Sequence, residues 1–451
     1  MQRLLIRNIK TLVSCDEQDT VYENVDLYAE NGIIRAIGPK LDRQADEVLD
    51  ASHMLCYPGL VNTHHHLYQQ FSRNLPQVQN MELFDWLKTL YEIWKNLDAE
   101  VIRLSSLTGM GELMKHGCTT CFDHHYVFPV GAGDLIGTQF AAASELGMRM
   151  HCSRGSMDLS VKDGGLPPDS VVQTVDEIMA DSARLIETYH DASFGSMRQV
   201  ALAPCSPFSV SAELLRQSAI LARQYHVRLH THLCETKDEE NYMLEREGMR
   251  PLAFMQTLGW VGPDVWYAHG IHFNDEELKL LAETGTGVCH CPASNMKLSS
   301  GIARIPDMLK LGVPVGLGVD GSASNDGSSL MEELRTAFLL HRLNSSREAP
   351  SGYDVLKIAT RGSARLLGRS DIGSLTAGKC CDLFLIDSRR MELVGACYDP
   401  KSVLATVGVR GPVDYTVVNG KITVREGRLA SVDEEKLARD AQAKCTEYLE
   451  K

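Results

Sequence analysis

The regular alternation of short apolar segments with helical segments is the feature that most constrains the fold of this chain. Helical patterns separate the apolar segments, at residues 81–96, 176–189, 211–225, 275–283 and 305–311. In the first of them Leu83, Leu87, Leu90 and Trp94 recur on one face. Strands are predicted at residues 54–62, 117–124, 149–155, 199–206, 228–234, 265–270, 287–292 and 313–320. Eight strands that alternate with helices predict an α/β fold, a (β/α)8 barrel of the TIM type. The active site of such a barrel forms at the carboxyl ends of its strands.

The two ends of the chain have a different pattern from the middle. Both contain short alternating runs punctuated by turn signals such as Asn31-Gly32 and Asn419-Gly420. Neither end alone has enough strand for a stable sheet. We therefore expect one small β-sandwich domain that combines both termini and flanks the barrel. The predicted division is residues 1–56 with 372–451 for this composite domain, 434–449 for its terminal helix, and 57–371 for the catalytic barrel.

Charge and composition exclude several classes of partner. Lys plus Arg minus Asp plus Glu gives 45 − 59 = −14, and an acidic surface disfavours binding to nucleic-acid backbones or anionic membranes. No run approaches the roughly 20 apolar residues of a membrane span. The first residues show no secretion signal, and the 13 cysteines are scattered. These features predict a cytoplasmic protein with reduced thiols.

Side chains suited to metal binding fall at the predicted carboxyl ends of separate strands. His64 and His66 are two residues apart and share one face of an extended chain, while His65 faces the other way. A lone strand-end histidine is more often an ordinary buried polar group. Further candidates follow later strands: His232 and Glu235 after the fifth, His269 at the sixth and Asp320 at the eighth. Because three histidines and one aspartate suit zinc or ferrous iron, this ordered set predicts a metal site.

The remaining histidines receive no catalytic assignment. His124, His125 and His272 lie near strand ends, and their roles stay open. Others fall in predicted helices or turns and are expected to be solvated: His53, His116, His190, His226 and His341.

Longer motifs around these residues resemble a known family. The motifs are P-G-L-V-N-T-H-H-H at 58–66, T-H-L-C-E at 231–235, A-H-G at 268–270 and G-V-D-G-S at 318–322. They resemble the amidohydrolase superfamily, in its branch of guanine, triazine and related amino-heterocycle deaminases, and the resemblance covers nearly the whole chain. N-T-H-H-H-L-Y-Q and A-L-A-P-C-S-P-F-S-V are similar to the 8-oxoguanine deaminase group in particular.

The resemblance implies a hydrolase that removes an exocyclic amine from an N-heterocycle. The best-matching group converts 8-oxoguanine and water to uric acid and ammonia, a step of purine catabolism. His64, His66, His232 and Asp320 would bind one divalent metal per subunit, zinc or alternatively ferrous iron. Asp320 would also take a proton from the attacking water, and His269 would orient that water. Glu235 would protonate the ring nitrogen beside the attacked carbon.

Two further properties follow from the resemblance. Binuclear members of the superfamily usually bridge their metals with a carboxylated lysine on the fourth strand. The corresponding segment here, Q-V-A-L-A-P-C-S-P, has no lysine, so a single catalytic metal is expected. The resemblance also implies a homo-oligomer whose partner is a small purine-like heterocycle.

Five residues are candidates for contact with the substrate. Cys205 stands where many relatives carry histidine, and we expect it to shape the pocket for a purine with an extra oxygen. Arg154 would donate to a ring carbonyl, although a salt bridge is the competing interpretation. Gln70 and Tyr126 would contact the edge of the heterocycle. Trp86 would cover its face or, alternatively, pack within its own helix.

Other functions stay open at this point. Guanine, isoxanthopterin and hydroxytriazines such as hydroxyatrazine share the same chemistry as 8-oxoguanine. A non-catalytic scaffold is a remote alternative. Such proteins lose metal ligands, whereas this sequence keeps all four candidates together with Glu235.

Overall fold

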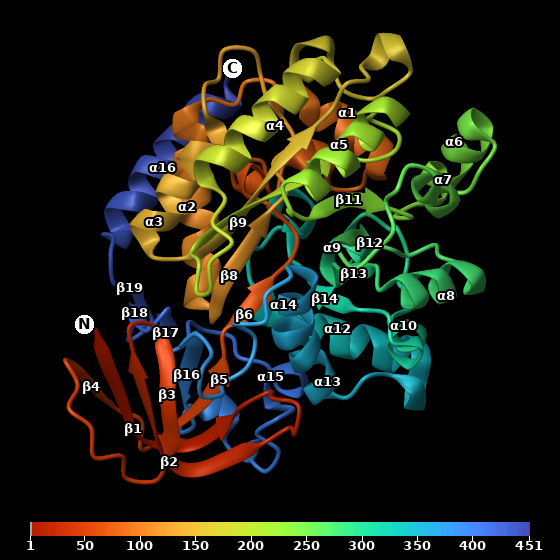
Figure 1. Ribbon diagram of the computed structural model, residues 1–451. Coiled ribbons are helices and arrows are strands. Elements are labelled where there is room, and N and C mark those ends of the chain that lie inside the picture. The colour runs from red at the N-terminus through yellow and green to blue at the C-terminus, as the bar shows by residue number, and fades with distance from the viewer. Residues whose placement is uncertain (1) are drawn as a thin grey trace.

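The computed structural model describes residues 2–451. A large barrel surrounded by helices lies beside a smaller sheet to which both ends of the chain contribute (Figure 1). Among the described residues, no helix combines the length and the apolar character needed to cross a membrane.

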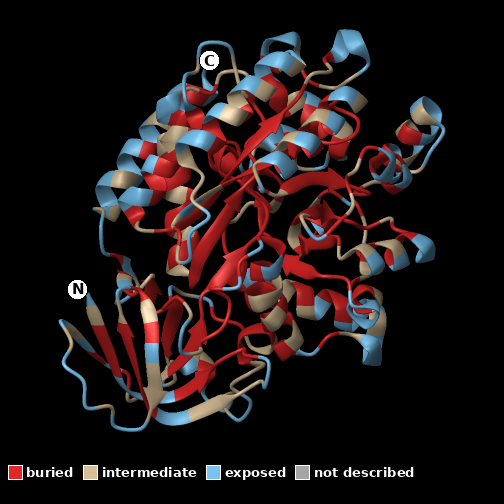
Figure 2. Cartoon of the chain, viewed as in Figure 1, coloured by how far each residue is buried: buried red, intermediate tan, exposed pale blue. Residues whose placement is uncertain are grey.

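The barrel consists of eight parallel strands that pair in chain order. They are β6 (Leu60–Asn62), β8 (Cys118–Asp123), β9 (Arg149–Ser156), β10 (Arg198–Pro204), β11 (Leu229–Leu233), β12 (Val265–His269), β13 (Gly287–His290) and β14 (Val315–Leu317). The predicted (β/α)8 barrel is confirmed. Figure 2 shows these strands almost entirely buried, with the exposed residues on the outer faces of the helices.

The first and last strands of the barrel meet beside the three consecutive histidines His64, His65 and His66. The backbone N–H of Thr63 donates to the Leu317 carbonyl at 3.1 Å. Beyond this bond, the short strand β7 (His65–His66) pairs in parallel with β15 (Asp320–Gly321). The closure of the barrel therefore brings residues more than 250 positions apart in sequence side by side.

Helices cover the outside of the barrel and the carboxyl ends of its strands. They are α1 (Leu83–Trp94), α2 (Ala99–Lys115), α3 (Leu135–Leu146), α4 (Val175–Tyr189), α5 (Ala212–Gln224), α6 (Lys237–Glu247), α7 (Pro251–Thr257), α8 (Asp275–Thr284), α9 (Pro292–Lys297), α10 (Ile305–Leu311), α11 (Ser322–Asn325), α12 (Leu330–Ser345), α13 (Gly352–Lys357) and α14 (Ser363–Leu366). The hydropathy pattern predicted α1, α4, α5, α8 and α10. It did not reveal α2, because α2 is buried on several sides and has no single apolar face.

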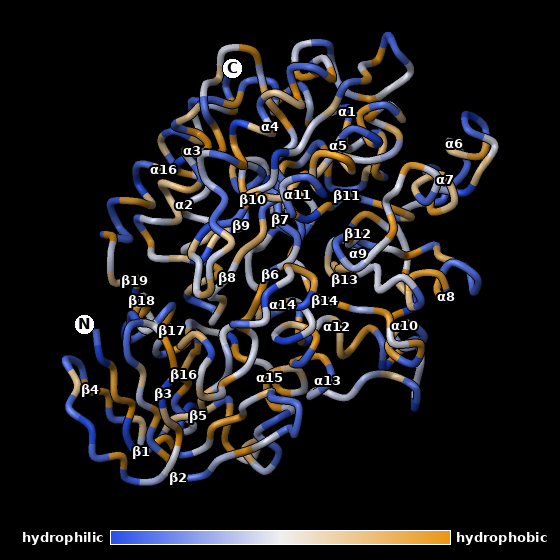
Figure 3. Tube along the Cα trace, in the orientation of Figure 1, coloured by the Kyte–Doolittle hydropathy of each residue, from blue (hydrophilic) through white to orange (hydrophobic). Residues whose placement is uncertain are grey.

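Both ends of the chain join in one nine-stranded sheet. Its strands are β1 (Arg3–Val13), β2 (Val21–Glu30), β3 (Ile33–Gly38), β4 (Glu47–Asp50), β5 (Met54–Pro58), β16 (Leu383–Asp387), β17 (Tyr415–Val418), β18 (Lys421–Arg425) and β19 (Arg428–Leu429). β5 links the two ends, because it pairs with β1 on one side and with β16 on the other. Apolar stretches follow the strands of this sheet and of the barrel (Figure 3).

The segment predicted as a single strand at 54–62 divides at Gly59. β5 belongs to the terminal sheet, whereas β6 opens the barrel. A Cβ atom at Gly59 would lie 2.1 Å from Thr119 Oγ1, so only glycine allows the chain to pass this closely between the two sheets. The terminal sheet therefore includes residues 57 and 58, just beyond the predicted domain division.

Two helices complete the C-terminal part. α15 (Val403–Thr406) packs against α12 and α13, and α16 (Glu434–Leu449) packs against α2. The predicted terminal helix at 434–449 is thus present, and it returns to the wall of the barrel.

Candidate active site

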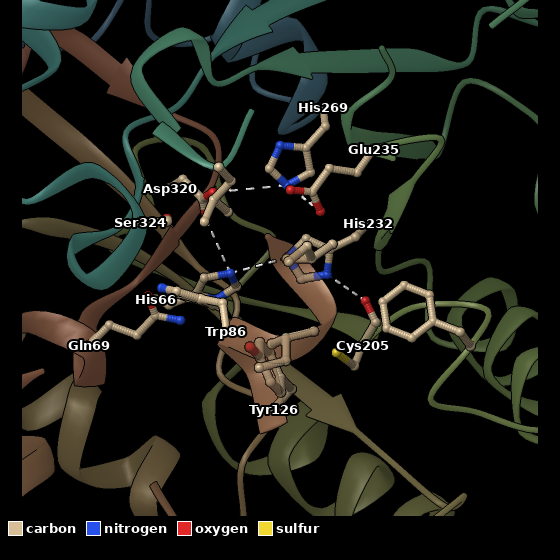
Figure 4. Close-up of a pocket in the computed structure, with 14 residues that line it drawn as sticks. His66, Gln69, Trp86, Tyr126, Cys205, His232, Glu235, His269, Asp320 and Ser324 are labelled. Carbon is tan, nitrogen blue, oxygen red and sulfur yellow. Dashed lines mark hydrogen bonds and ion pairs between the residues drawn. The ribbon is translucent and has the colours of Figure 1, made fainter. Parts of the chain in front are cut away.

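A cavity lies at the carboxyl ends of the barrel strands, and its free space together with the solvent at its mouth is about 370 Å³. Active sites of this fold form at this end of the barrel. Figure 4 shows the side chains that line the cavity: His66, Gln69, Leu83, Trp86, Leu87, Tyr126, Cys205, Phe208, His232, Glu235, His269, Leu298, Asp320 and Ser324.

Two histidines direct a free nitrogen atom toward the floor of this cavity. His66 Nδ1 lies 2.6 Å from the His124 carbonyl oxygen, and His232 Nδ1 lies 2.5 Å from that of Cys205. Because a carbonyl only accepts hydrogen bonds, each Nδ1 carries the proton. The Nε2 atom of each ring therefore keeps its lone pair and can bind a metal.

His64 also keeps a free lone pair on Nε2, and its tautomer is fixed through His230. His230 donates from Nδ1 to the Trp266 carbonyl at 3.0 Å, so its Nε2 is an acceptor. His64 Nδ1 lies 2.8 Å from this Nε2 and must donate to it. His64 Nε2 is therefore left with a lone pair, and it has no hydrogen-bond partner among the described residues although it is buried.

The converging atoms have the spacing of a metal shell. His66 Nε2 lies 3.1 Å from His232 Nε2, and Asp320 Oδ1 lies 3.2 Å from His64 Nε2 and 3.3 Å from His66 Nε2. Ligands of a tetrahedral zinc ion, with bonds of about 2.0–2.2 Å, are separated by roughly 3.3 Å. Buried lone pairs and a carboxylate at these distances repel one another unless a cation lies between them. The cluster can therefore hold a metal ion. Two overlapping groups of donor side chains have ligand atoms within 4.8 Å of one another: His64, His66, His124 and His232 in one, and His64, His232, His269 and Asp320 in the other. The predicted set of His64, His66, His232 and Asp320 takes members from both groups.

The ionisation of the cluster agrees with this interpretation. Burial lowers the pKa of His64 to about 3 and that of His232 well below its usual value, so both imidazoles are neutral at pH 7. Neutral imidazoles and an ionised carboxylate are the forms that bind metals.

Glu235 and His269 face each other beside the cluster. His269 Nε2 lies 3.6 Å from Glu235 Oε2 and 3.9 Å from Asp320 Oδ2. His269 Nδ1 lies 2.9 Å from Asn295 Oδ1, which fixes the ring. Burial raises the pKa of Glu235, and the opposing effect of His269 does not cancel that rise. Burial lowers the pKa of His269, but Glu235 and Asp320 raise it further, so the net shift is upward.

Three residues at the strand ends adopt left-handed backbone conformations. The φ angles are 54° at Cys234, 70° at His269 and 62° at Asp320. Such angles cost non-glycine residues about 1–3 kcal/mol each and persist only where the surroundings enforce them. They turn the chain sharply at the end of each strand, which aims Glu235, His269 and Asp320 into the cavity.

Three of the predicted substrate residues line the cavity, namely Trp86, Tyr126 and Cys205. The ring centroids of Trp86 and Trp94 lie 5.5 Å apart, so Trp86 packs within its own helix as well, and contact with the face of the substrate stays a prediction. Its indole Nε1 is buried and has no partner among the described residues. Burial raises the pKa of the Cys205 thiol to about 12, so the thiol is neutral.

The prediction that Arg154 contacts the substrate is wrong. Its guanidinium donates to Asp181 and to Gln173, each at 2.7 Å, and lies 3.9 Å above the ring of Phe128. Asp181 belongs to α4, outside the barrel. Because successive residues of β9 alternate in direction, Arg154 points toward the helix layer, and the competing salt-bridge interpretation holds.

The prediction for Gln70 is also wrong, since the adjacent Gln69 lines the cavity. After the strand the chain forms the 3-10 helix η1 (Leu67–Phe71). In such a helix residues three apart share a face, so Gln69 falls on the same side as His66. Gln70 points away and bonds to Ser322 at 2.7 Å and Glu112 at 3.3 Å. Gln69 Oε1 is buried and lacks a partner among the described residues.

Sequence reasoning missed the apolar wall of the cavity. Leu83 and Leu87 share a helix face with Trp86, and this spacing was the available signal. Phe208 lies in the segment after β10 and Leu298 directly follows α9, where no pattern marks a pocket residue.

The other histidines are also placed by the structure. His65 points away from the cavity, with Nε2 2.7 Å from Ser328 Oγ. His124 stacks on His232 with ring centroids 4.7 Å apart, and its buried Nδ1 lacks a partner among the described residues. The expectation that His341 is solvated is wrong, because it is buried and its Nε2 lies 3.1 Å from that of His290.

Comparison with known proteins gives consistent results. The model of the amidohydrolase family matches residues 55–423. The chain is 49% identical to the 8-oxoguanine deaminase of Pseudomonas aeruginosa over 384 residues, which cover 85% of each chain. It is 41% identical to the hydroxydechloroatrazine ethylaminohydrolase of Pseudomonas sp. strain ADP, over 98% of this chain and 95% of that protein. The crystal structure of atrazine chlorohydrolase from Arthrobacter aurescens, complexed with zinc, superposes with a TM-score of 0.95 at 33% identity, covering 98% and 100% of the two chains.

Proposed function

Because the chain belongs to the amidohydrolase family, we propose that it hydrolyses 8-oxoguanine to uric acid and ammonia. Water supplies the oxygen that replaces the exocyclic amino group, and the amine leaves as ammonia. The observation that carries this proposal is the convergence of three free imidazole nitrogens and Asp320 at the floor of the buried cavity that Glu235 lines. The 49% identity to a deaminase of this substrate supports the choice of heterocycle.

In this proposal His64, His66, His232 and Asp320 hold one zinc ion, with ferrous iron as the alternative. Such an ion supplies hydroxide at neutral pH by lowering the pKa of water. A single ion is supported by β10, which contains no lysine that could bridge a second one. The relative with the superposable structure was crystallised with zinc.

The proposed proton transfers use three side chains. Asp320 Oδ2, held at 2.6 Å by the Ser294 hydroxyl, accepts a proton from the attacking water. His269 Nε2 orients that water from the gap between Glu235 and Asp320. Glu235, which burial keeps protonated to a higher pH than usual, donates to the ring nitrogen beside the attacked carbon. Protonation makes that carbon more electrophilic, and transfer of a proton to the amine lets ammonia leave.

The wall of the cavity binds the heterocycle in this proposal. Trp86 and Phe208 offer flat apolar surface to its faces, and Tyr126 lies at its edge. Gln69 brings an amide with an unpartnered oxygen, which can accept a hydrogen bond from a ring N–H. The small neutral thiol of Cys205 leaves room that an imidazole would fill. If Cys205→His left substrate preference unchanged, this role for Cys205 would be wrong.

An ammonia-release screen with parallel metal analysis tests the proposal. The substrates are 8-oxoguanine, guanine, isoxanthopterin and hydroxyatrazine, assayed with the purified full-length chain. We expect the highest kcat/KM on 8-oxoguanine. Activity on guanine well above that on 8-oxoguanine would overturn the choice of substrate.

A hydroxytriazine substrate is the second candidate. It is supported by the relative named as a hydroxydechloroatrazine ethylaminohydrolase, to which the similarity extends over 98% of this chain. A higher kcat/KM on hydroxyatrazine in the same screen would favour it. A metal-free protein that hydrolyses none of these compounds would instead favour the scaffold alternative.

The proposal also covers the oligomeric state of the protein and its place in the cell. We propose a homo-oligomer that works in the cytoplasm on a free purine-like heterocycle and binds neither nucleic acid nor membranes. The net charge of −14 supports the last part. Light scattering of the purified protein measures the oligomeric state, and a monomer would contradict the first part.

A further inference from the structure

We propose that Glu239 is a positioning residue whose carboxylate holds the turn between β11 and α6 so that Glu235 enters the cavity. The inference rests on the proposed function, because it concerns the placement of the residue to which that proposal gives the acid role. Glu239 itself does not line the cavity.

The carboxylate of Glu239 binds two consecutive backbone amides. Oε1 accepts from the Cys234 N–H at 2.9 Å, and Oε2 accepts from the Glu235 N–H at 2.9 Å. Glu239 is fully buried, with no exposed surface. Burying an ionisable side chain costs free energy unless its hydrogen bonds compensate, so this arrangement is not an incidental surface contact.

This arrangement differs from an ordinary helix cap. α6 begins at Lys237 after the N-cap residue Thr236, and Glu239 occupies its third position. In a capping box a glutamate at this position bonds to the backbone N–H of the N-cap residue. Glu177 does so in α4, where it accepts from the Thr174 N–H at 2.9 Å. Glu239 instead reaches past Thr236 to the two residues before it.

The clamped turn is strained and joined to the rest of the site. Cys234 has a φ angle of 54°, which the two bonds to Glu239 help to maintain. The Cys234 carbonyl in turn accepts from the N–H groups of Ile271 and His272, both at 2.9 Å. The turn after β11 is thereby fixed to the turn that follows His269.

Little else holds the side chain of Glu235. Its Oε1 lies 3.4 Å from Ser300 Oγ, a long hydrogen bond, and its Oε2 lies 3.6 Å from His269 Nε2. The position of its carboxyl group therefore depends on the backbone that Glu239 fixes. Displacing a reacting group by about 1 Å can cost on the order of 100-fold in rate.

Two amide donors need a side chain with two acceptors and no donor. A carboxylate meets this need, whereas glutamine has one acceptor and would place its NH2 group against a backbone N–H. Glu239→Gln therefore has nearly the same shape and breaks one of the two bonds. We expect it to lower kcat by roughly 10- to 100-fold while KM and metal content change less than about twofold.

A double-mutant cycle tests whether Glu239 acts through Glu235. The full-length chain is compared with Glu235→Ala, Glu239→Gln and the double variant, with kcat, metal content and thermal unfolding measured for each. Because an absent carboxyl group cannot be misplaced, Glu239→Gln should change the residual kcat of Glu235→Ala less than about twofold. Glu177→Gln, which alters an ordinary capping box on the surface, is the matched control and should leave kcat unchanged.

Equal fold-losses from Glu239→Gln in the two backgrounds, or no loss in the parent chain, would overturn the inference alone. Full activity of Glu235→Ala would overturn the acid role of Glu235 as well, so the two failures are distinguishable. If Glu239→Gln does not fold, Glu239→Asp goes through the same cycle. It keeps two acceptors but is one methylene shorter, and the same non-additivity is expected.

Discussion

The floor of the cavity, which carries the proposed metal ligands His64, His66, His232 and Asp320, is held differently from its wall, which includes Gln69 and Trp86. On the floor, His66 and His232 are each anchored through Nδ1 to a backbone carbonyl, and His64 is anchored to His230. On the wall, Gln69 Oε1 and Trp86 Nε1 have no partner among the described residues. The floor is therefore organised before any ligand arrives, whereas polar atoms of the wall are left for the substrate to satisfy.

The two regions also originate from different parts of the fold. The proposed ligands of the floor stand at the ends of barrel strands, where the closure of the sheet brings them together. The wall comes from η1, α1, the segment after β10 and the end of α9. This difference predicts that changes to the floor abolish the reaction, while changes to the wall alter which substrate is used.

The largest expected effect is the loss of a floor ligand. His64→Ala or His66→Ala should lose the metal together with detectable ammonia release, because each removes a converging lone pair. His65→Ala is the control from the same motif, and it should keep the metal because its ring bonds to Ser328 instead. Metal analysis of the three purified variants checks this, and a metal-free His65→Ala would contradict it.

Loss of the proposed acid comes next. Glu235→Gln should lower kcat by about 10²- to 10⁴-fold, since general acid–base groups contribute this much to catalysis. The variant should keep its metal, because Glu235 is outside the proposed ligand set. Steady-state kinetics beside metal analysis separates the two effects, and unchanged kcat would remove Glu235 from the mechanism.

A smaller effect is expected from changing His230, which orients the proposed ligand His64. His230→Ala leaves His64 Nδ1 without its partner at 2.8 Å, so the ring is free to turn. Outer residues of this kind typically contribute about 10- to 100-fold to metal affinity. Competition with a chelator measures the affinity of the variant, and an affinity equal to that of the parent would show that the strand alone orients His64.

The smallest expected effect concerns the wall. Gln69→Ala removes one hydrogen-bonding amide and should raise KM by roughly 2- to 10-fold, since a neutral hydrogen bond contributes about 0.5–1.5 kcal/mol. Gln70→Ala is the neighbouring control, because that side chain bonds to Ser322 and Glu112 away from the cavity. Equal changes in KM for the two variants would contradict the proposal that Gln69, and not Gln70, contacts the substrate.

The difference between the floor and the wall of the cavity explains how much of the site could be predicted from the sequence. Chain order and strand alternation place His64, His66, His232, His269 and Asp320 at one end of the barrel without knowledge of any side-chain contact. The fold follows from the same alternation, although the division of residues 54–62 between two sheets depends on the close approach at Gly59.

The wall could not be predicted in this way, because its residues depend on local turns and on tertiary packing. One turn of 3-10 helix decides between Gln69 and Gln70, and sequence patterns locate such turns poorly. Arg154 was misplaced for a related reason. Its position at a strand end suggested the cavity, but the alternation along β9 turns it toward Asp181.

Metal reconstitution of the chelated protein tests the central claim most directly. Zinc is added stepwise to the metal-free chain while ammonia release from 8-oxoguanine and the bound metal are measured together. Four ligands around one centre predict that activity rises linearly and reaches its plateau at one ion per chain. A plateau at two ions per chain, or full activity before any metal is added, would contradict the account.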